Sequence, residues 1–188
     1  MPTILGEIAR LSARESGRIA AARGEGGAVD PSSDKLAALE DVVALLDAHD
    51  LPYALVGGVA VGLRSGVPRA TIDTDLAVAT TVDRARVVDL LRAGGFELRG
   101  EFVHTSNFRH RSGEPVQIMF DAAFDPMIER AEAVDVGSRS IRVVTTEDLI
   151  AMKERAARDP ARRRSKALRD LADVALLRGD VPDPEEGW

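Results

Sequence analysis

A short apolar run that leads directly into two glycines is the feature that most limits how this chain can fold. Residues 52–56 read PYALV, Gly57 and Gly58 follow, and residues 59–64 continue as VAVGLR. The first run is short, apolar and bounded by turn-forming residues, which predicts a buried strand. The small residues after the glycines predict a helix that packs closely against that strand.

Helical and strand patterns alternate along most of the remaining chain. The predicted helices span residues 3–23, from a cap at Ser32 or Ser33 to about 49, 59–64, 82–93, 126–133, 145–158 and from Pro160 to about 178. The predicted strands span 52–56, 73–79, 97–99, 102–109, 115–121, 134–136 and 140–144. Together they predict an α/β (α+β) fold, a mixed sheet flanked by helices with a C-terminal helical element. We expect an N-terminal helical arm and linker (1–30), a core (31–145) and C-terminal helices that complete a cleft (146–188).

The composition excludes several classes of function. The 188 residues carry a formal net charge of −6 and include no cysteine. The negative charge argues against non-specific binding of nucleic acid over the whole surface. Without cysteine there are no disulfides, thiolate zinc sites or thiol nucleophiles, which suits a reducing compartment. No apolar run reaches the ~20 residues of a membrane span, and the N-terminus lacks a signal-peptide pattern, so we expect a cytoplasmic protein without a membrane partner.

Two carboxylates stand two positions apart at the start of the second predicted strand. Asp73 and Asp75 lie at positions i and i+2, so both side chains leave the same face of the sheet. Like charges at this spacing repel each other, and a divalent cation relieves the repulsion. Magnesium prefers one or two carboxylates together with phosphate oxygens, which makes this pair a candidate Mg²⁺ site. One solvated turn residue and one capping residue explain an isolated Asp-x-Asp equally well.

Gly57 and Gly58 give this pair a second component. Glycines between a strand and a helix let backbone N–H groups approach a phosphate at the helix N-terminus. Taken alone, the two glycines are explained better by tight packing of the strand on the helix. Because they stand just upstream of Asp73 and Asp75, they predict a phosphate cradle beside a metal site.

A third carboxylate is expected at the end of the strand over residues 115–121. Alternation places Gln117, Met119 and Asp121 on one face of that strand. Asp121 therefore becomes a candidate third acid that meets the Asp-x-Asp pair. An ordinary strand-terminal aspartate is an interpretation of nearly equal weight, and Asp125 is a lesser candidate.

These residues bring the chain close to a known family. The segment LVGGVAVGLRSGVPRATIDTDLAV, residues 55–78, resembles the nucleotidyltransferase fold of the polymerase-β-like superfamily. More narrowly, the Gly-Gly-x-Ala and Pro-Arg-Ala-Thr-x-Asp-x-Asp patterns resemble the abortive-infection toxin type of nucleotidyltransferase. The segment TTEDLIAMKERAARDPARRRSKALRDLADVALL, residues 145–177, is similar to that group's downstream motifs. The resemblance covers roughly residues 51–178.

The resemblance implies a role for each matching position. Gly57 and Gly58 would hold the triphosphate of an incoming nucleotide. Apart from the resemblance, Arg69 precedes the Asp-x-Asp strand, where it pairs with Asp73, contacts the nucleotide or is a plain loop arginine, the last being the favoured interpretation. Asp73 and Asp75 would coordinate Mg²⁺. The remaining implied site residues are Asp121 as third acid and acceptor base, Lys153 as a phosphate contact, and Asp170 with Asp173 as the fourth motif. The second cradle position is Gly where many members carry Ser, and the large C-terminal domain of longer members is absent.

Basic residues gather between positions 153 and 169 of an otherwise acidic chain. The cluster contains Lys153, Arg155, Arg158, Arg162, Arg163, Arg164, Lys166 and Arg169. Solvated charges on helices explain most such clusters, with Lys166 and Asp170 as an ordinary surface pair at i, i+4. Lys153 differs, because its apolar neighbours predict an inward position. One face of the predicted last helix is charged and is expected to point into a cleft, where it would order Lys153 or Arg169 against phosphate. This face holds Lys166, Arg169, Asp170 and Asp173, and the opposite face holds Leu168, Leu171, Ala172 and Ala175.

Two functions remain open from the sequence. The first is a metal-dependent nucleotidyltransferase that moves a nucleoside monophosphate from an NTP to an acceptor, which is a tRNA, a protein hydroxyl or a small molecule. The subgroup resemblance adds a role as the toxin of a toxin–antitoxin pair, with an antitoxin protein as partner, and the arginine-rich turn suits an RNA backbone. The alternative is a catalytically inactive nucleotide-binding or regulatory module within a hetero-oligomer.

Overall fold

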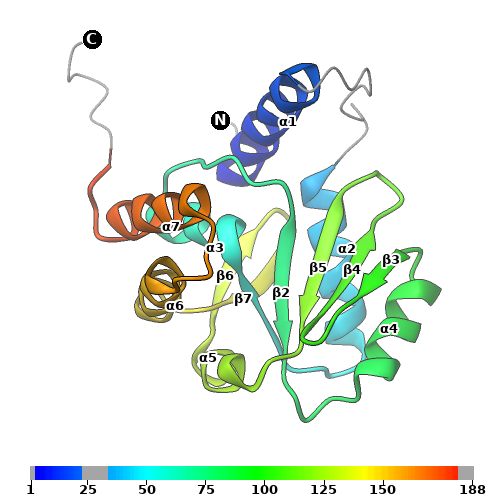
Figure 1. Ribbon diagram of the computed structural model, residues 1–188. Helices are drawn as coiled ribbons and strands as arrows, with labels where there is room; N and C mark the ends of the chain where they lie inside the picture. Colours follow the sequence, from blue (N-terminus) through cyan, green and yellow to red (C-terminus); the bar gives the residue numbers. More distant parts are fainter. Residues whose placement is uncertain (1–2, 23–33, 182–188) are drawn as a thin grey trace.

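A seven-stranded mixed sheet forms the centre of the molecule in a computed structural model that describes residues 3–22 and 34–181 (Figure 1). The strand order is β3-β4-β5-β2-β1-β7-β6. The strands are β1 (Tyr53–Val56), β2 (Thr74–Val78), β3 (Glu97–Glu101), β4 (Thr105–Arg109), β5 (Pro115–Met119), β6 (Glu132–Val136) and β7 (Arg139–Val143). The mixed α/β class predicted from the sequence is confirmed.

Strand directions place the start of β2 next to the start of β5. β2 pairs antiparallel with β1 and parallel with β5, and Asp75 of β2 lies opposite Gln117 of β5. The two flanking hairpins, β3-β4 with β5 and β6 with β7, are antiparallel. Because β2 and β5 run in the same direction, residues at equal depth along them share a level of the sheet.

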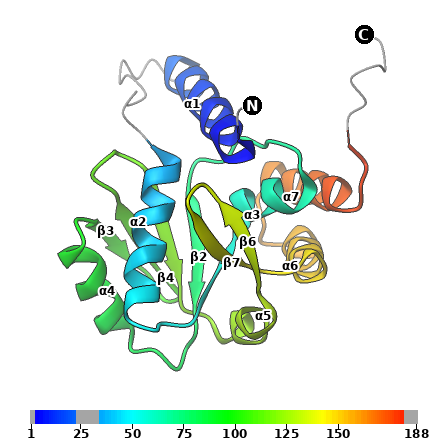
Figure 2. The ribbon, with the colours of Figure 1, turned by 180° about the vertical axis from the view of Figure 1, so that it is seen from behind.

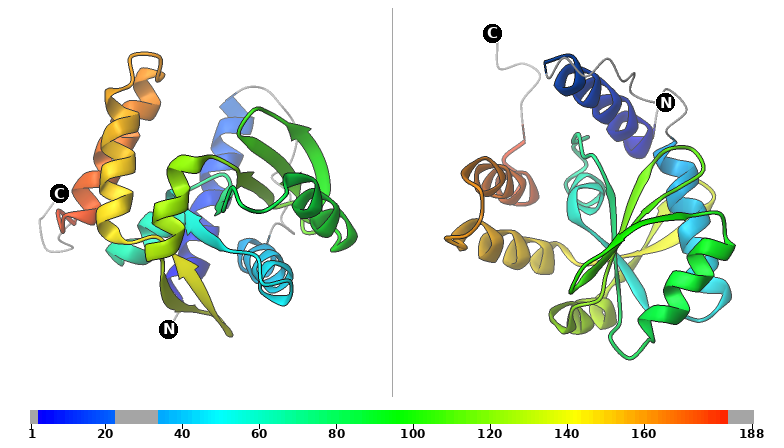
Figure 3. Two further views of the ribbon diagram at one scale, coloured as in Figure 1. Left: turned by 90° about the horizontal axis from the view of Figure 1, so that it is seen from below. Right: turned by 45° about the vertical axis from the view of Figure 1, so that its right-hand side comes forward.

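Helices cover the sheet unevenly. They are α1 (Ile4–Ala22), α2 (Lys35–Ala48), α3 (Gly57–Ser65), α4 (Arg84–Ala93), η1 (Ala122–Phe124), α5 (Asp125–Arg130), α6 (Thr146–Arg158) and α7 (Arg164–Leu177). Figure 2 shows α2 and α4 lying across one face of the sheet, and Figure 3 shows α6 and α7 packed side by side at its flank. Within residues 3–22 and 34–181, none of the helices has the length and apolar character that crossing a bilayer requires.

Strand alternation separates a core face from a polar face. Leu76 of β2 and Ile118 of β5 are fully buried on the face that α2 and α4 cover, together with Leu39 of α2. Asp75 and Gln117 point to the opposite face and are only partly buried. The alternate side chains on one face of the sheet thus pack into the core, and those on the other face can be polar.

Several element boundaries differ from the sequence prediction by a few residues, and three helix starts are examples. Helix α3 begins at Gly57, two residues earlier than expected, so both glycines lie in its first turn. Helix α2 is capped by Asp34, whose carboxylate accepts a hydrogen bond from the Ala37 N–H; Ser32 and Ser33 lie outside the described residues, as does most of the predicted linker. Helix α7 begins at Arg164 rather than Pro160, because the Asp159 side chain accepts the Ala161 N–H and holds a turn there.

Helix α7 buries two carboxylates while two of its leucines are exposed. Asp170 and Asp173 are 2% and 1% exposed, whereas Leu168 and Leu171 are 57% and 52% exposed. Lys166 and Arg169, which were predicted on the same face as the two aspartates, are exposed, whereas Val174 and Leu177 of this helix are buried. Ion pairs inside the molecule, described below, explain why the carboxylates face inward.

A buried ion pair joins α2 to the turn between β4 and β5. The Lys35 ammonium pairs with the Glu114 carboxylate, and both side chains are almost fully buried. The Thr74 hydroxyl donates to the same carboxylate at 3.4 Å, which links the pair to β2. Burial of one partner without the other would leave an uncompensated charge in the core.

We expect that Lys35→Met destabilises the chain by about 3–5 kcal/mol, because Glu114 then remains buried without its cation. The double variant Lys35→Met/Glu114→Gln should recover much of that loss. Urea denaturation followed by circular dichroism measures both values. A single-variant cost below about 1 kcal/mol would show that the pair has no structural weight.

Candidate active site

A cavity of about 300 Å³ lies where α3, the start of β2 and the two C-terminal helices meet. Fourteen residues line it: Gly57, Gly58, Arg69, Ala70, Thr71, Ile72, Asp73, Asp75, Gln117, Lys153, Arg162, Lys166, Arg169 and Asp170. The strand side contributes carboxylates and the helix side contributes cations. Most of the residues predicted for the site from the sequence therefore line this one cavity.

The two glycines are required by close contacts. Gly57 has φ +69°, and a Cβ atom there would lie 2.0 Å from Oδ2 of Asp75. A Cβ atom at Gly58 would lie 2.6 Å from the Thr71 hydroxyl oxygen. No side chain caps the N-terminus of α3, so its first N–H groups remain available to an anion. The predicted cradle and the predicted metal carboxylates are in direct contact.

Asp75 ionises with difficulty in this setting. Burial and, to a lesser degree, the negative charge of Asp73 raise the pKa of Asp75 to about 7, while Lys153 acts in the opposite direction. A carboxylate of this kind gains from a divalent cation, since the cation compensates both the lost hydration and the repulsion from Asp73.

A buried network of charges supports the cationic wall. The Lys153 Nζ atom lies 3.1 Å from Oδ1 of Asp170 and 2.8 Å from Oδ2 of Asp173. Arg69 pairs with Asp173, and Arg162 lies 2.7 Å from Oδ2 of Asp170. The two aspartates thus act as counter-ions that hold three cations at the cavity. Arg69 is bound to α7 and not to Asp73.

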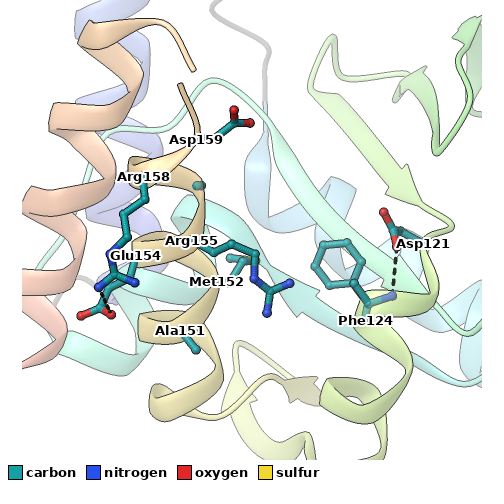
Figure 4. A pocket seen from close by; sticks show the side chains of 10 residues that line it. Asp121, Phe124, Ala151, Met152, Glu154, Arg155, Arg158 and Asp159 are labelled. Carbon is teal, nitrogen blue, oxygen red and sulfur yellow. Dashed lines mark hydrogen bonds and ion pairs between the residues drawn. The ribbon is translucent and has the colours of Figure 1, made fainter. Parts of the chain in front are cut away.

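Asp121 does not join the cavity of Asp73 and Asp75. Gln117 lies opposite Asp75, and Asp121 comes four positions later in the chain. At the rise of a strand, Asp121 therefore lies about 13 Å further along the strand direction than Asp75. Its carboxylate accepts the Ala123 N–H at 2.9 Å and caps η1. Figure 4 shows it in a second cavity of about 700 Å³, opposite α6, where Arg155 and Phe124 also lie. Alternation along the strand predicted the face of Asp121, but it could not predict how far along the strand Asp121 lies. The expected meeting of Asp121 with Asp73 and Asp75 is therefore not found in this cavity.

Sequence reasoning assigned neither Thr71 nor Gln117 to the site, and it placed Arg162 only in the basic cluster. Thr71 and Gln117 line the cavity beside the carboxylates, and Arg162 belongs to its cationic wall. Gln117 was visible only as a face-sharing neighbour of Asp121, and its meeting with Asp75 depends on strand register. Asp125, the lesser candidate, accepts two hydrogen bonds from Thr80 and braces the loop after β2.

The profile of one protein family, the nucleotidyl transferase AbiEii toxin of type IV toxin–antitoxin systems, matches residues 38–186. The chain belongs to this family. No curated protein shows a significant match to the chain. The resemblance to the toxin-type nucleotidyltransferases predicted from the sequence is confirmed, and the chain is a nucleotidyltransferase by family.

Solved structures show the same fold at low sequence identity. ANT(2")-Ia in complex with adenylyl-2"-tobramycin is 18% identical with a TM-score of 0.56, over 79% of this chain and 91% of that one. The lincosamide antibiotic adenylyltransferase LnuA, lincomycin-bound, is 14% identical with a TM-score of 0.56, over 76% and 96%. An antigenic nucleotidyltransferase-like protein from Paracoccidioides brasiliensis is 22% identical with a TM-score of 0.54, over 82% and 80%.

The residues of this AbiEii family member suit magnesium better than a metal held wholly by protein. In residues 3–22 and 34–181, no group of three or more His, Cys, Asp or Glu side chains has a metal-binding arrangement. Two carboxylates that face an anion cradle match the preference of Mg²⁺ for one or two carboxylates plus phosphate oxygens. Asp73 and Asp75 would hold such an ion.

The raised pKa of Asp75 predicts how stability changes with pH. Between about pH 4 and 7 the folded chain holds a proton on Asp75 that the unfolded chain has released, so stability falls as pH rises through this range. Asp75→Asn lacks this penalty. Its stability advantage over the wild type should grow by up to about 4 kcal/mol from pH 4 to pH 8 without divalent ions.

Urea denaturation of both proteins across this pH range measures the difference. Added Mg²⁺ should stabilise the wild type at pH 8 and leave Asp75→Asn unchanged. A pH-independent difference between the two proteins would contradict a raised pKa at this position.

Proposed function

We propose that this chain is a Mg²⁺-dependent enzyme that transfers a nucleoside monophosphate from an NTP to an acceptor. One observation carries the proposal: Asp73 and Asp75 share a 300 Å³ cavity with the two glycines at the N-terminus of α3. Carboxylates for a metal and backbone donors for a polyphosphate are the two parts that nucleotidyl transfer requires.

The donor nucleotide would bind with its phosphates between the two walls of the cavity. The N–H groups at Gly57 and Gly58 would bind phosphate oxygens, assisted by the positive end of the α3 dipole. Lys153 and Arg162 on the opposite wall would compensate the remaining phosphate charge, because Asp170 and Asp173 hold them in place. Arg69 would support this wall through Asp173.

In the proposed reaction an acceptor oxygen forms a bond to the α-phosphorus, the bond to the bridging oxygen breaks, and pyrophosphate leaves. Bound Mg²⁺ supplies charge neutralisation on the phosphates and at the attacking oxygen. Lys153 and Arg162 stabilise the charge that develops on the leaving pyrophosphate. We retain Asp121 as a candidate acceptor base only for an acceptor that also fills the second cavity, since Asp121 lines that cavity and not the first.

The cationic residues in the α6–α7 turn and the first half of α7 favour an anionic acceptor such as a tRNA. Arg163, Arg164, Lys166 and Arg169 are exposed, and the last two line the cavity. The phosphate backbone of an RNA end would bind such a surface, whereas a polycationic small molecule would be repelled. As a toxin, the chain would act on an RNA of its own cell in the cytoplasm and be kept in check by an antitoxin protein.

The donor half of the proposal is tested with radiolabelled NTPs, Mg²⁺ and bulk tRNA. Asp75→Asn should lower transfer at least about a hundredfold, because it removes a charge that acts on the reacting phosphates. Asp121→Asn is the matched control, the same substitution in the neighbouring cavity, and should keep most of the activity. Equal losses in both variants would instead restore Asp121 as the third acid, and equal activity in all three proteins would refute the assigned site.

The acceptor half is tested by the salt dependence of RNA binding. The double variant Arg163→Ala/Arg164→Ala keeps Arg162, which forms an ion pair with Asp170. If each arginine contacts one phosphate of a single-stranded end, the slope of log K against log salt should decrease in magnitude by about 1.4. Fluorescence anisotropy with labelled tRNA measures the slope. An unchanged slope would remove this turn from the RNA surface.

A further inference from the structure

Gln117 is the side chain that lies directly beside Asp75 on the neighbouring strand. The parallel pairing of β2 and β5 sets the two residues opposite each other, and both line the same cavity. Neighbouring strands of a sheet lie roughly 4.7–4.9 Å apart, so side chains that leave the same face at the same level are adjacent. A polar group at position 117 therefore reaches an ion that Asp75 holds.

The amide of Gln117 is oriented by a residue on the far side. Its Nε2 donates a hydrogen bond to Oδ1 of Asn107 at 2.9 Å. Asn107 is on β4 and Asp75 on β2, and these strands flank β5 on opposite sides. The hydrogen bond draws the nitrogen toward β4 and leaves Oε1 for the cavity. Within residues 3–22 and 34–181, the side chain of Gln117 makes no other hydrogen bond, so Oε1 is free to bind a ligand.

A neutral group at position 117 avoids adding a third negative charge to a site that already contains two. Asp73 and Asp75 already repel each other in a partly dehydrated cavity, and a third carboxylate would increase that repulsion. An amide oxygen supplies a hard ligand for a divalent cation without adding a negative charge. Gln117 can therefore contact the metal ion and still leave the site less negative than a third carboxylate at this position would.

On the basis of the proposed function, we propose that Gln117 is a neutral third member of the metal centre, with Oε1 facing the ion that Asp73 and Asp75 hold. The centre then carries two negative charges where three carboxylates would carry three. It binds a divalent ion weakly by itself and more tightly once nucleotide phosphates add oxygen ligands. Ion and nucleotide therefore bind cooperatively.

The test measures Mn²⁺ binding to the full chain at pH 8 without nucleotide, from the electron paramagnetic resonance signal of free Mn²⁺. Gln117→Glu should bind Mn²⁺ at least about tenfold more tightly than the wild type. Gln117→Met, which keeps the size and removes the oxygen, should bind about tenfold more weakly. Asn107→Asp is the matched charge control, since it places a carboxylate one strand further away, and should change the affinity less than Gln117→Glu.

The assignment of Gln117 stands if Gln117→Glu tightens binding beyond Asn107→Asp and Gln117→Met weakens it. Any other pattern overturns it, including equal tightening by both added carboxylates. Asp75→Asn separates this inference from the proposed function. If Asp75→Asn binds Mn²⁺ as the wild type does, the proposed metal site itself fails; if it loses binding while the Gln117 variants match the wild type, only the inference on Gln117 fails. Circular dichroism of each variant confirms that it is folded.

Discussion

The pairing of Asp173 with Lys153 and Arg69 is the interaction on which the site depends most. It links three separate parts of the chain: α7, α6 and the loop before β2. A carboxylate that is 1% exposed is very costly to bury alone, so α7 can dock only where both cations are in place. The same requirement fixes Lys153 above the cavity. Helix packing and the cationic wall are therefore two results of one set of ion pairs, and this explains why Leu168 and Leu171 of α7 remain exposed.

The cavity separates its charges by secondary structure. The strand wall carries Asp73 and Asp75, and the helix wall carries Lys153 and Arg162. Lys153 and Arg162 are already paired with Asp170 and Asp173. These pairs hold the two cations on the helix wall, away from direct ion pairs with the strand wall. A ligand that satisfies both walls must present anionic oxygens to the helices and bring a cation to the strands. A metal–polyphosphate complex has this charge distribution, and a simple anion or a simple cation does not.

Local patterns in the sequence predicted the elements well, and their failures have physical causes. Gly57-Gly58 and Asp73-x-Asp75 were found from local patterns, since a glycine pair and an i, i+2 spacing describe geometry within a few residues. The depth of Asp121 was not, because alternation assigns a face while the level along a strand depends on pairing with another strand. The shared face of Asp170 and Asp173 on α7 followed from helical spacing, but the ion pairs of Asp173 with Arg69 and Lys153 join segments far apart in the sequence and depend on the fold.

Gly57 shows that the phosphate cradle and the metal carboxylates form one unit. Any side chain at this position would occupy the space of the Asp75 carboxylate, so the first turn of α3 and the start of β2 are in contact without an intervening layer. The positive end of the helix dipole alone would favour the charged form of Asp75. Burial and Asp73 nevertheless raise its pKa, so in this structure the loss of hydration outweighs the helix end. The uncompensated negative charge of Asp75 therefore lies beside the N–H groups at the start of α3. A cation bound to Asp75 and a phosphate bound to these N–H groups would attract each other, so each would bind more tightly in the presence of the other.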